Sequence, residues 1–288
     1  MTPRPPARGS GRPPEPRKGS PKNPRPRSTN RSTEVPLRRA PEGLGGEQVE
    51  GRQAVLELLH ARRRNVRKIY IADALEPAAI LDEIEEEARR QRVSVQFVSR
   101  ARLDRDARTE GHQGVYAEAD RLKSVDLDDF LVNDRGFLFV ADGVTDPRNL
   151  GAMLRSADGA GVTGVVLPRH RSARISPTVT KTAAGAVEYL NYAQVGGIPA
   201  ALERMNKAGV VTVGLAGEAT KSLYDLDLGS VPVALVVGGE ENGMAQLTRK
   251  RCTHVVSIPQ LGQISSLNAG VAVSIAMFEV ARQRALHP

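Results

Sequence analysis

Three loops in the C-terminal half of the chain carry the side chains best suited to chemistry. The first, D-G-V-T-D-P-R-N-L-G-A-M-L-R-S-A at residues 142–157, offers Asn149 and Arg155. An amide and a guanidinium can orient a hydroxyl group and stabilise a developing negative charge. Both residues also fit a structural role, because Asn149 is a good helix N-cap and Arg155 could lie at the surface or in an ion pair. On its own this loop leaves both interpretations open.

The second loop, V-V-G-G-E-E-N-G-M at residues 236–244, joins a predicted strand to a predicted helix. Glycines such as Gly238 let a ligand approach the backbone, and Glu240 adds a carboxylate. The spacing matches neither G-x-G-x-x-G nor G-x-x-x-x-G-K-[ST], so it supports neither of these nucleotide-binding mechanisms. The alternative is a tight strand-to-helix turn in which Glu240 is merely solvated.

The third loop, I-P-Q-L-G-Q-I-S-S-L-N at residues 258–268, places serines at a predicted helix start, where backbone N–H donors are free. Residues 269–278 are apolar on nearly every side and rich in small side chains, which predicts a buried helix. The alternative is a core helix that Ser265 caps.

An alternating α/β pattern must position these loops. Strands are predicted at residues 137–141, 162–167, 210–215, 233–237 and 255–258, with helices that start at Asn149, Pro177, Ala245 and Ser265. This order is typical of a mostly parallel sheet covered on both faces, in which ligands bind at the carboxyl ends of the strands.

A smaller α/β domain is predicted at residues 46–120. Helical spacing appears around residues 55–59 and 80–88, and strands are predicted at 66–71, 93–97 and 115–119, with a loop at 104–113. The polar segment 121–136 is predicted to be a linker to the domain at residues 137–288. The basic run at residues 62–68 either contacts phosphates or forms a solvated face.

The positive charge of the 288-residue chain is confined to its start. Residues 1–45 contain 11 of the 41 basic residues, 3 of the 33 acidic ones and 11 of the 19 prolines, so the whole net charge of +8 lies there. Such a segment cannot bury enough apolar surface to fold and is predicted to be disordered. Its charge indicates an acidic polymer as partner.

Several classes of protein are excluded by composition. The start has no apolar signal segment, and no apolar stretch is long enough to span a membrane. The single Cys252 fits a reducing compartment, so the expected location is the cytoplasm. The five histidines are scattered, which gives no zinc signature and no metal expectation, and none lies by a G-x-S-x-G nucleophile elbow.

Taken in order and spacing, D-P-R-N-L-G-A-M-L-R-S-A, V-V-G-G-E-E-N-G-M and I-P-Q-L-G-Q-I-S-S-L-N-A-G-V-A resemble the three motifs of the SpoU (TrmH-type) family of SPOUT RNA ribose 2′-O-methyltransferases. The small domain, with E-G-R-Q-A-V near its start and H-Q-G-V near its end, resembles the ribosomal-protein-like substrate-binding domain of many members. The resemblance implies an S-adenosylmethionine-binding α/β fold with a C-terminal trefoil knot, and an active site completed in a homodimer.

The resemblance also implies roles for individual residues. Gly238, Ile258 and Leu267 match positions that contact the cofactor through the backbone. The polar site residues are matched by Asn149, Arg155, Glu240, Ser266 and Asn268. Arg155 is expected to activate the ribose hydroxyl or stabilise its charge, and Asn149 to position Arg155 and the substrate. Glu241 stands where the family usually has glycine.

The domain order favours a guanosine of 23S ribosomal RNA as the substrate. Related members that modify transfer RNA usually lack the added N-terminal domain. The alternatives are a transfer-RNA enzyme, an antibiotic-resistance methyltransferase that acts on ribosomal RNA, and a non-catalytic ribosomal-RNA-binding assembly factor on the same fold.

Overall fold

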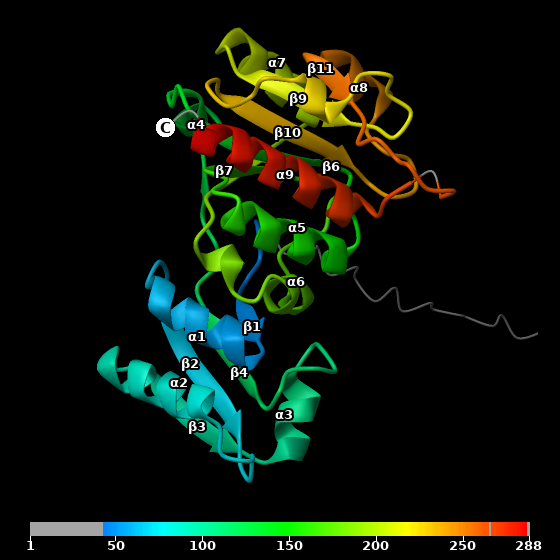
Figure 1. The fold of residues 1–288 in the computed structure, drawn as a ribbon. Coiled ribbons are helices and arrows are strands. Elements are labelled where there is room, and N and C mark those ends of the chain that lie inside the picture. Colours follow the sequence, from blue (N-terminus) through cyan, green and yellow to red (C-terminus); the bar gives the residue numbers. More distant parts are fainter. Residues whose placement is uncertain (1–42, 265, 287–288) are drawn as a thin grey trace, which may run out of the picture. The chain divides into compact units, whose positions relative to one another are not determined.

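The computed structural model describes residues 43–264 and 266–286, which form two sheets and the helices that cover them (Figure 1). Residues 1–42, and with them most of the predicted tail, lie outside the described residues. Within the described part of the chain, no helix is both long and apolar enough to cross a membrane.

The small domain is built on a four-stranded sheet in the order β1-β4-β2-β3. Strand β4 is antiparallel to β1 and β2, whereas β3 is parallel to β2. Helices α1 and α2 pack on one face of the sheet and α3 on the other. The elements are β1 Gln48–Glu50, α1 Arg52–Ala61, β2 Val66–Ala72, α2 Ala79–Arg90, β3 Ser94–Val98, α3 Arg100–Asp106 and β4 Val115–Ala119. The predicted strands and both predicted helices are therefore confirmed, while α3 reaches into a stretch predicted as loop.

The larger sheet has seven parallel strands in the order β11-β9-β10-β6-β7-β8-β5. Its strands are β5 Ser124–Val125, β6 Phe137–Asp142, β7 Gly164–Pro168, β8 Tyr192–Val195, β9 Val211–Leu215, β10 Val233–Gly238 and β11 His254–Val256. Its helices are α4 Asp128–Leu131, α5 Pro147–Gly159, α6 Pro177–Thr182, α7 Ile198–Lys207, α8 Gln246–Arg251 and α9 Ala269–Leu286, with short 3-10 turns η1 Ala186–Glu188 and η2 Leu223–Asp225. The predicted parallel α/β sheet is confirmed.

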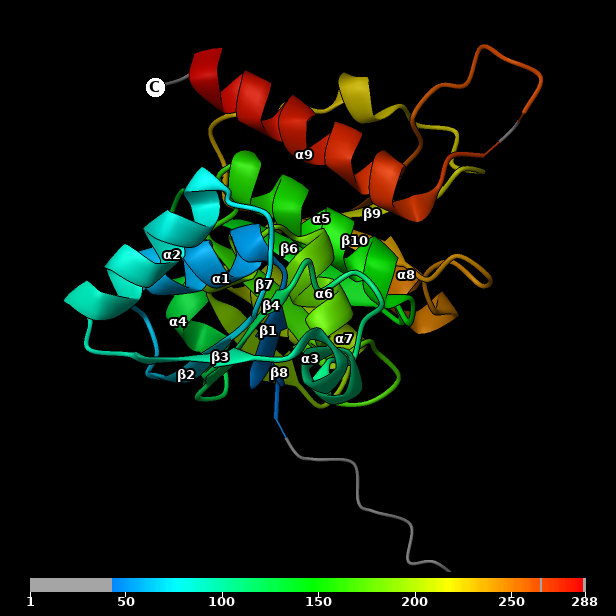
Figure 2. The same cartoon turned by 90° about the horizontal axis from the view of Figure 1, so that it is seen from below.

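Alternating side chains of the central strands create two apolar layers. Phe137 and Phe139 of β6 belong to the cluster shared with α5, α6 and α9, whereas Leu138 and Val140 belong to the cluster shared with α4 and α7. Both faces of the sheet are therefore covered, as a buried parallel sheet requires. Figures 1 and 2 both show α9 lying beside α5.

The predicted linker at residues 121–136 is wrong, because this segment belongs to the larger sheet. Strand β5 pairs with β8, and Leu127 and Phe130 are buried against the sheet. A Cβ added at Gly164 would lie 2.7 Å from the Phe130 ring, so glycine makes room for this side chain. Two short apolar anchors within a polar sequence are enough to fix the segment.

Two helices begin at other residues than predicted. Helix α5 begins at Pro147 after the N-cap Asp146, whose side chain accepts a hydrogen bond from the backbone N–H of Arg148. Asn149 therefore lies inside the helix and is not its cap. Helix α9 begins at Ala269, and the predicted start at Ser265 falls on a position outside the described residues.

Leu44 and Gly45, which were predicted to belong to the tail, are part of the larger domain. Leu44 is buried in the core of the larger domain, and its carbonyl accepts a hydrogen bond from the Ile175 N–H at 3.0 Å. The Gly46 N–H donates to the Ile175 carbonyl at 2.8 Å, so the two bonds flank Gly45. Gly45 has a φ of +96°, and a Cβ there would lie 2.5 Å from the Ile175 carbonyl oxygen. Only glycine tolerates this close approach at that φ.

Candidate functional site

The central strands bring the first two loops together at one edge of the sheet. Strands β6 and β10 are paired in register, so Asp142 lies opposite Gly238 where both strands end. The Asp142 carboxylate accepts a hydrogen bond from the Ala245 N–H at 2.8 Å, and its carbonyl accepts one from the Gly239 N–H at 3.2 Å. The first loop therefore fixes both ends of the second.

The glycines of the second loop allow it to fold back on itself. A Cβ added at Gly238 would lie 1.9 Å from the carbonyl carbon of Gly243, a distance that no real side chain tolerates. The Gly243 N–H donates to the Gly239 carbonyl at 2.8 Å, and Gly243 has a φ of +60°. These residues make a tight turn that presents Glu240 at its tip.

Asn149, Glu240 and Asn268, one residue from each of the three loops, meet in a polar cluster. The amide Nδ2 atoms of Asn149 and Asn268 each donate to Glu240 Oε1 at 2.6 Å. Asn268 Nδ2 also lies 3.2 Å from Asn149 Oδ1, and Asn268 Oδ1 accepts from the N–H of Val271 in the first turn of α9. The residues come from positions 149, 240 and 268, so the fold, not local sequence, creates the cluster.

A cavity of about 650 Å³, called here the first cavity, lies beside this cluster. It is enclosed by the loops after β9, β10 and β11. Six of the eight candidate residues line it, namely Gly238, Glu240, Ile258, Ser266, Leu267 and Asn268. Its volume falls within the roughly 300–1,000 Å³ typical of small-molecule sites.

One wall of the first cavity was not predicted from the sequence. Residues 215–218, which follow β9, line it, and Glu218 forms an ion pair with Arg249 there. A hydrogen bond from its own backbone N–H, followed by the hydrogen bond from Arg249, lowers the pKa of Glu218. The segment lacks a glycine-rich motif, but its place after a predicted strand is a signal that could have found it.

A second cavity of about 950 Å³ lies on the other side of the Glu240 loop. Asn149 lines this cavity and not the first. Gly238, Gly239 and Glu240 line both. The polar cluster therefore stands between two cavities, which suits a reaction between two bound molecules.

Arg155 does not join the cluster within the described chain. It is exposed on α5, lines neither cavity, and has no hydrogen bond or ion pair with another described residue. Its neighbour Ser156 accepts a hydrogen bond from Ser274 Oγ at 2.7 Å, which joins α5 to α9. Arg155 thus stands on a surface beside α9.

The basic run at residues 62–68 is largely used inside the chain. Arg64 donates from Nε to Glu188 Oε2 at 2.8 Å, and both side chains are almost fully buried. Arg62 pairs with Glu87 at 2.6 Å. Arg64 is therefore a buried structural residue, whereas Arg62 is paired but mostly exposed.

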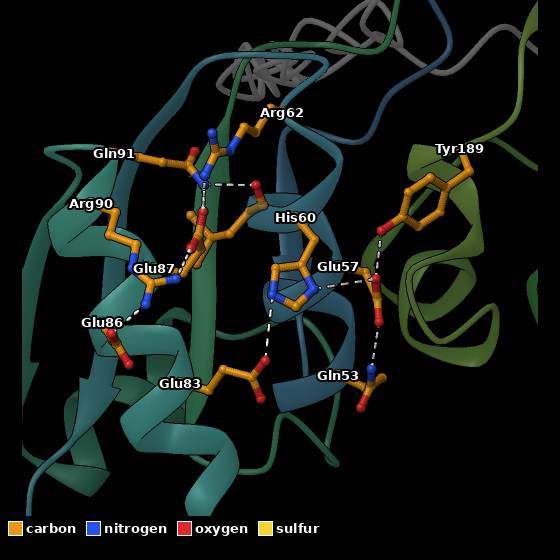
Figure 3. A network of polar contacts seen from close by, with 11 residues as sticks. Gln53, Glu57, His60, Arg62, Glu83, Glu86, Glu87, Arg90, Gln91 and Tyr189 are labelled. Atoms are coloured by element: carbon orange, nitrogen blue, oxygen red, sulfur yellow. Dashed lines mark hydrogen bonds and ion pairs between the residues drawn. The ribbon is translucent and has the colours of Figure 1, made fainter.

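The carboxylates around α1 form the network drawn in Figure 3. Hydrogen bonds from Arg62 and then Gln91 lower the pKa of Glu87 to about 2. Glu57 accepts hydrogen bonds from Gln53 at 2.7 Å and from the Tyr189 hydroxyl at 2.6 Å. The network fastens α1 to α2 and to the segment that follows η1.

The motifs E-G-R-Q-A-V and H-Q-G-V of the small domain hold the loop around residues 106–114 in place. Glu50, which is fully buried, accepts hydrogen bonds from the N–H groups of Arg108 and Thr109 at 2.7 and 3.0 Å. His112 is also buried, accepts from the Gly114 N–H at 3.0 Å, and lies 2.8 Å from Asp104. Both residues are satisfied structurally.

Comparison with protein families gives two matches. Residues 136–278 match the SpoU rRNA Methylase family, and residues 48–125 match the family described as RNA 2′-O ribose methyltransferase substrate binding.

Curated relatives match over most of the chain. The 23S rRNA (guanosine-2′-O-)-methyltransferase RlmB of Pasteurella multocida is 40% identical over 243 residues, which covers 83% of this chain and 98% of the relative. The protein of the same name from Xanthomonas axonopodis pv. citri is 43% identical over 242 residues, with coverage of 82% and 96%.

Solved structures share the fold. The SpoU methyltransferase AviRb from Streptomyces viridochromogenes, in complex with the cofactor AdoMet, has a TM-score of 0.69 and 25% identity, covering 83% of this chain and 90% of that one. An AdoMet-bound rRNA methyltransferase from Sinorhizobium meliloti has a TM-score of 0.68 at 22% identity, with coverage of 82% and 86%.

Proposed function

The chain belongs to the SpoU rRNA methylase family, and from that premise we propose that it methylates the ribose 2′-oxygen of a guanosine in 23S ribosomal RNA with S-adenosylmethionine. The observation that carries the proposal is the cluster of Asn149, Glu240 and Asn268 between two cavities. A methyl transfer needs the donor and the acceptor oxygen in line, one on each side of such a cluster.

The first cavity suits the cofactor by shape and by chemistry. Its floor is the turn at Gly238, where the absence of a side chain exposes the backbone to a ligand. Glu240 and Glu218 supply carboxylates for ribose hydroxyls and for a nearby positive charge. Gly238, Ile258 and Leu267 would hold the cofactor through their backbone groups. When bound, S-adenosylmethionine supplies a methyl group already activated on a sulfonium.

The residues of the cluster would act on the ribose. Both amides donate to Oε1 of Glu240, so among the described residues Oε2 is left to accept a bond from the substrate hydroxyl. We assign Asn149 the positioning of the ribose, with Ser266 and Asn268 at the cavity edge. As the 2′-oxygen bonds to the methyl carbon, the carbon–sulfur bond would break, the hydroxyl proton would pass to Glu240 Oε2, and Arg155 would stabilise the charge that develops.

Because Arg155 stands away from the cluster within one chain, we propose that a second copy brings it there. The exposed apolar side chains Val271 and Phe278 lie on α9, next to the helix that carries Arg155, and Leu261 and Ile264 are exposed in the preceding loop. Isolated apolar side chains are ordinary at a protein surface. Several of them on one helix and on the loop before it favour an interface with another molecule. The site is then completed in a homodimer.

We propose that the segment from β11 to α9 is threaded as a trefoil knot. Strand β11 lies at the edge of the sheet, whereas α9 returns to pack beside α5 over the central strands. The return passes the loops after β9 and β10, which together enclose the first cavity. We also propose that the protein works in the cytoplasm, where its ribosomal substrate is made.

The small domain is proposed to bind the RNA outside the target nucleotide, supported by the match of residues 48–125 to a substrate-binding family. The domain boundaries 46–120 and 137–288 remain part of the proposal, with residues 121–136 now counted with the larger sheet.

Labelled methyl transfer to 23S ribosomal RNA from a strain without this modification tests the function. We expect one methyl group per RNA on a guanosine 2′-oxygen, identified by mapping the nucleotide. Transfer to transfer RNA, or modification of a drug-binding nucleotide with a gain of resistance, would reassign the substrate. Tight RNA binding without any transfer would instead support an assembly factor.

A further inference from the structure

The second cavity is the largest feature near the cluster that neither the sequence motifs nor the cofactor explains. It lies at the carboxyl ends of β6, β7 and β8, where ligands of parallel sheets bind. Its volume of about 950 Å³ exceeds that of the first cavity. Of the first and second cavities, only the second is lined by the loops after β7 and β8.

The walls of the second cavity differ in charge. Asp146, Glu240 and Glu241 line the side next to the cluster, and His170 and Arg171 line the side that follows β7. An anionic group is favoured on the second side, and hydroxyl donors on the first. A ligand with a phosphate and a ribose would therefore enter in one orientation.

The N-terminus of α7 adds to the positive side. Gly197 is its N-cap, and no side chain caps the helix, so the first-turn N–H groups depend on other partners. Gly196, Gly197 and Ile198 all line the cavity. The helix N-terminus, with its partial positive charge, favours an anion at this point.

Two observations point to a ligand beyond the helix end itself. A Cβ added at Gly196 or Gly197 would meet no atom within 4 Å, so this wall is open. Thr248, which is fully buried, also lines the cavity, and its hydroxyl has no hydrogen-bond partner among the described residues. A buried hydroxyl without a partner is costly, and a polar ligand would relieve that cost.

We propose that the second cavity holds the target nucleotide, with its phosphate on His170, Arg171 and the α7 N-terminus and its ribose at Glu240. This inference rests on the proposed function and assigns its substrate side. It requires the nucleotide to leave its stack in the RNA, because a stacked base cannot enter a cavity. The Thr248 hydroxyl then bonds to the nucleoside.

Binding of small ligands tests this without turnover. Dissociation constants for 5′-GMP, guanosine and inorganic phosphate are measured by calorimetry or NMR with S-adenosylhomocysteine present. We expect 5′-GMP to bind more tightly than either part, and Arg171→Ala to weaken 5′-GMP by about tenfold or more while changing guanosine little.

Arg169→Ala is the matched control, because Arg169 is an exposed arginine in the same loop that does not line the second cavity. Equal losses for both variants would show a general charge effect and overturn the proposal. So would phosphate that binds as tightly as 5′-GMP, since the cavity would then be an anion site only.

Thr248→Val removes the unpaired hydroxyl at nearly constant volume. We expect it to weaken guanosine and 5′-GMP by a similar factor of about three to ten, while the melting temperature stays equal or rises. Unchanged binding of both ligands would remove Thr248 from the site.

The proposal and the function can fail separately. If the wild-type protein binds 5′-GMP as described but transfers no methyl group to RNA, the activity is wrong and the nucleotide site stands. If it methylates RNA while Arg171→Ala has the wild-type KM for RNA and the wild-type affinity for 5′-GMP, the activity stands and the nucleotide site is wrong.

Discussion

At the scale of single residues, Arg155 is the site residue whose proposed role depends most on a second copy of the chain. One chain leaves its guanidinium exposed, whereas the proposed site needs it beside the ribose. Asn149, Glu240 and Asn268, by contrast, already touch one another. The spacing of the motifs does not reveal that Arg155 lies outside the cluster within one chain, because that depends on how α5 is oriented in the fold.

Arg155→Ala is expected to lower kcat by about a hundredfold or more and to leave the affinity for S-adenosylmethionine nearly unchanged, because the lost interaction forms in the transition state. Arg155→Lys should not restore the rate, since an ammonium lacks the planar fork of the guanidinium. Single-turnover methyl transfer and cofactor titration on the same protein provide the measurement. A rate near that of the wild type would leave Arg155 as an ordinary surface residue.

The lowered pKa of Glu87 predicts how the stability of the protein depends on pH. Its pKa is lowered from 4.5 to about 2, first by the hydrogen bond from Arg62. Its contribution is therefore fully present above the unfolded pKa and is lost as pH falls from about 4.5 towards 2. Arg62 is mostly exposed, so we expect this contribution to be about 1–2 kcal/mol rather than the full value of the shift.

Urea unfolding of the wild type and of Glu87→Gln between neutral pH and pH 3 measures this contribution of Glu87 to the free energy of unfolding. The variant should be less stable than the wild type at neutral pH, and the difference should shrink in acid. Glu86→Gln, which changes an exposed partner of Arg90, is the control and should have little effect. A difference that grows in acid would contradict the assignment.

At the scale of elements, the sequence predicted those strands and helices whose local hydrophobic pattern is strong. The central strands β6, β7, β9 and β10 were found because each is an apolar run, as a strand buried on both faces must be. Strand β8 and helix α7 were missed because β8 is short and contains Gln194, and α7 follows two glycines and holds Pro199 in its first turn. Missing them also hid one wall of the second cavity, which the loop after β8 and the N-terminus of α7 form.

Helix α9 was predicted to be buried on every side, and the structure buries only part of it. Val273, Ala276 and Met277 are fully buried, whereas about half of Val271 and of Phe278 is exposed. A helix without a polar face is expected to be covered by something. That argument supports the second copy.

Phe278→Glu is expected to convert the proposed dimer to monomers in sedimentation at micromolar concentration, because it would bury a charge in the proposed apolar interface. Methyl transfer should fall with it, since Arg155 of the second copy would be lost. Val132→Ser, at an exposed apolar residue beyond α4, is the control and should leave the dimer intact. A wild-type monomer with full activity would contradict both the interface and the shared site.

At the scale of the whole molecule, charge is unevenly distributed. The segment before Gly43 holds 11 basic and 3 acidic residues, and the rest of the chain is neutral overall. Because Leu44 is buried, a deletion that spares the fold must end at residue 42. Removal of residues 1–42 is expected to flatten the salt dependence of RNA affinity, with the slope falling by about 0.7–0.9 for each phosphate that the segment neutralises in the full-length protein.

Filter binding across a salt series measures that slope, and methyl transfer at saturating RNA should be retained. An unchanged slope would show that the segment neutralises no phosphates. Loss of transfer at saturation would instead give it a part in the chemistry.

The order of the strands has a consequence for how the protein is made. The cluster around Asn149 cannot form until Glu240, 91 residues further along the chain, and Asn268, 119 residues further along, have been synthesised. At translation rates of about 5–20 residues per second, a nascent chain passes several seconds with β6 and α5 synthesised and their partners β10 and α9 still missing. The nascent chain therefore carries no complete cluster until Asn268 has been synthesised, so the site can form only late in synthesis.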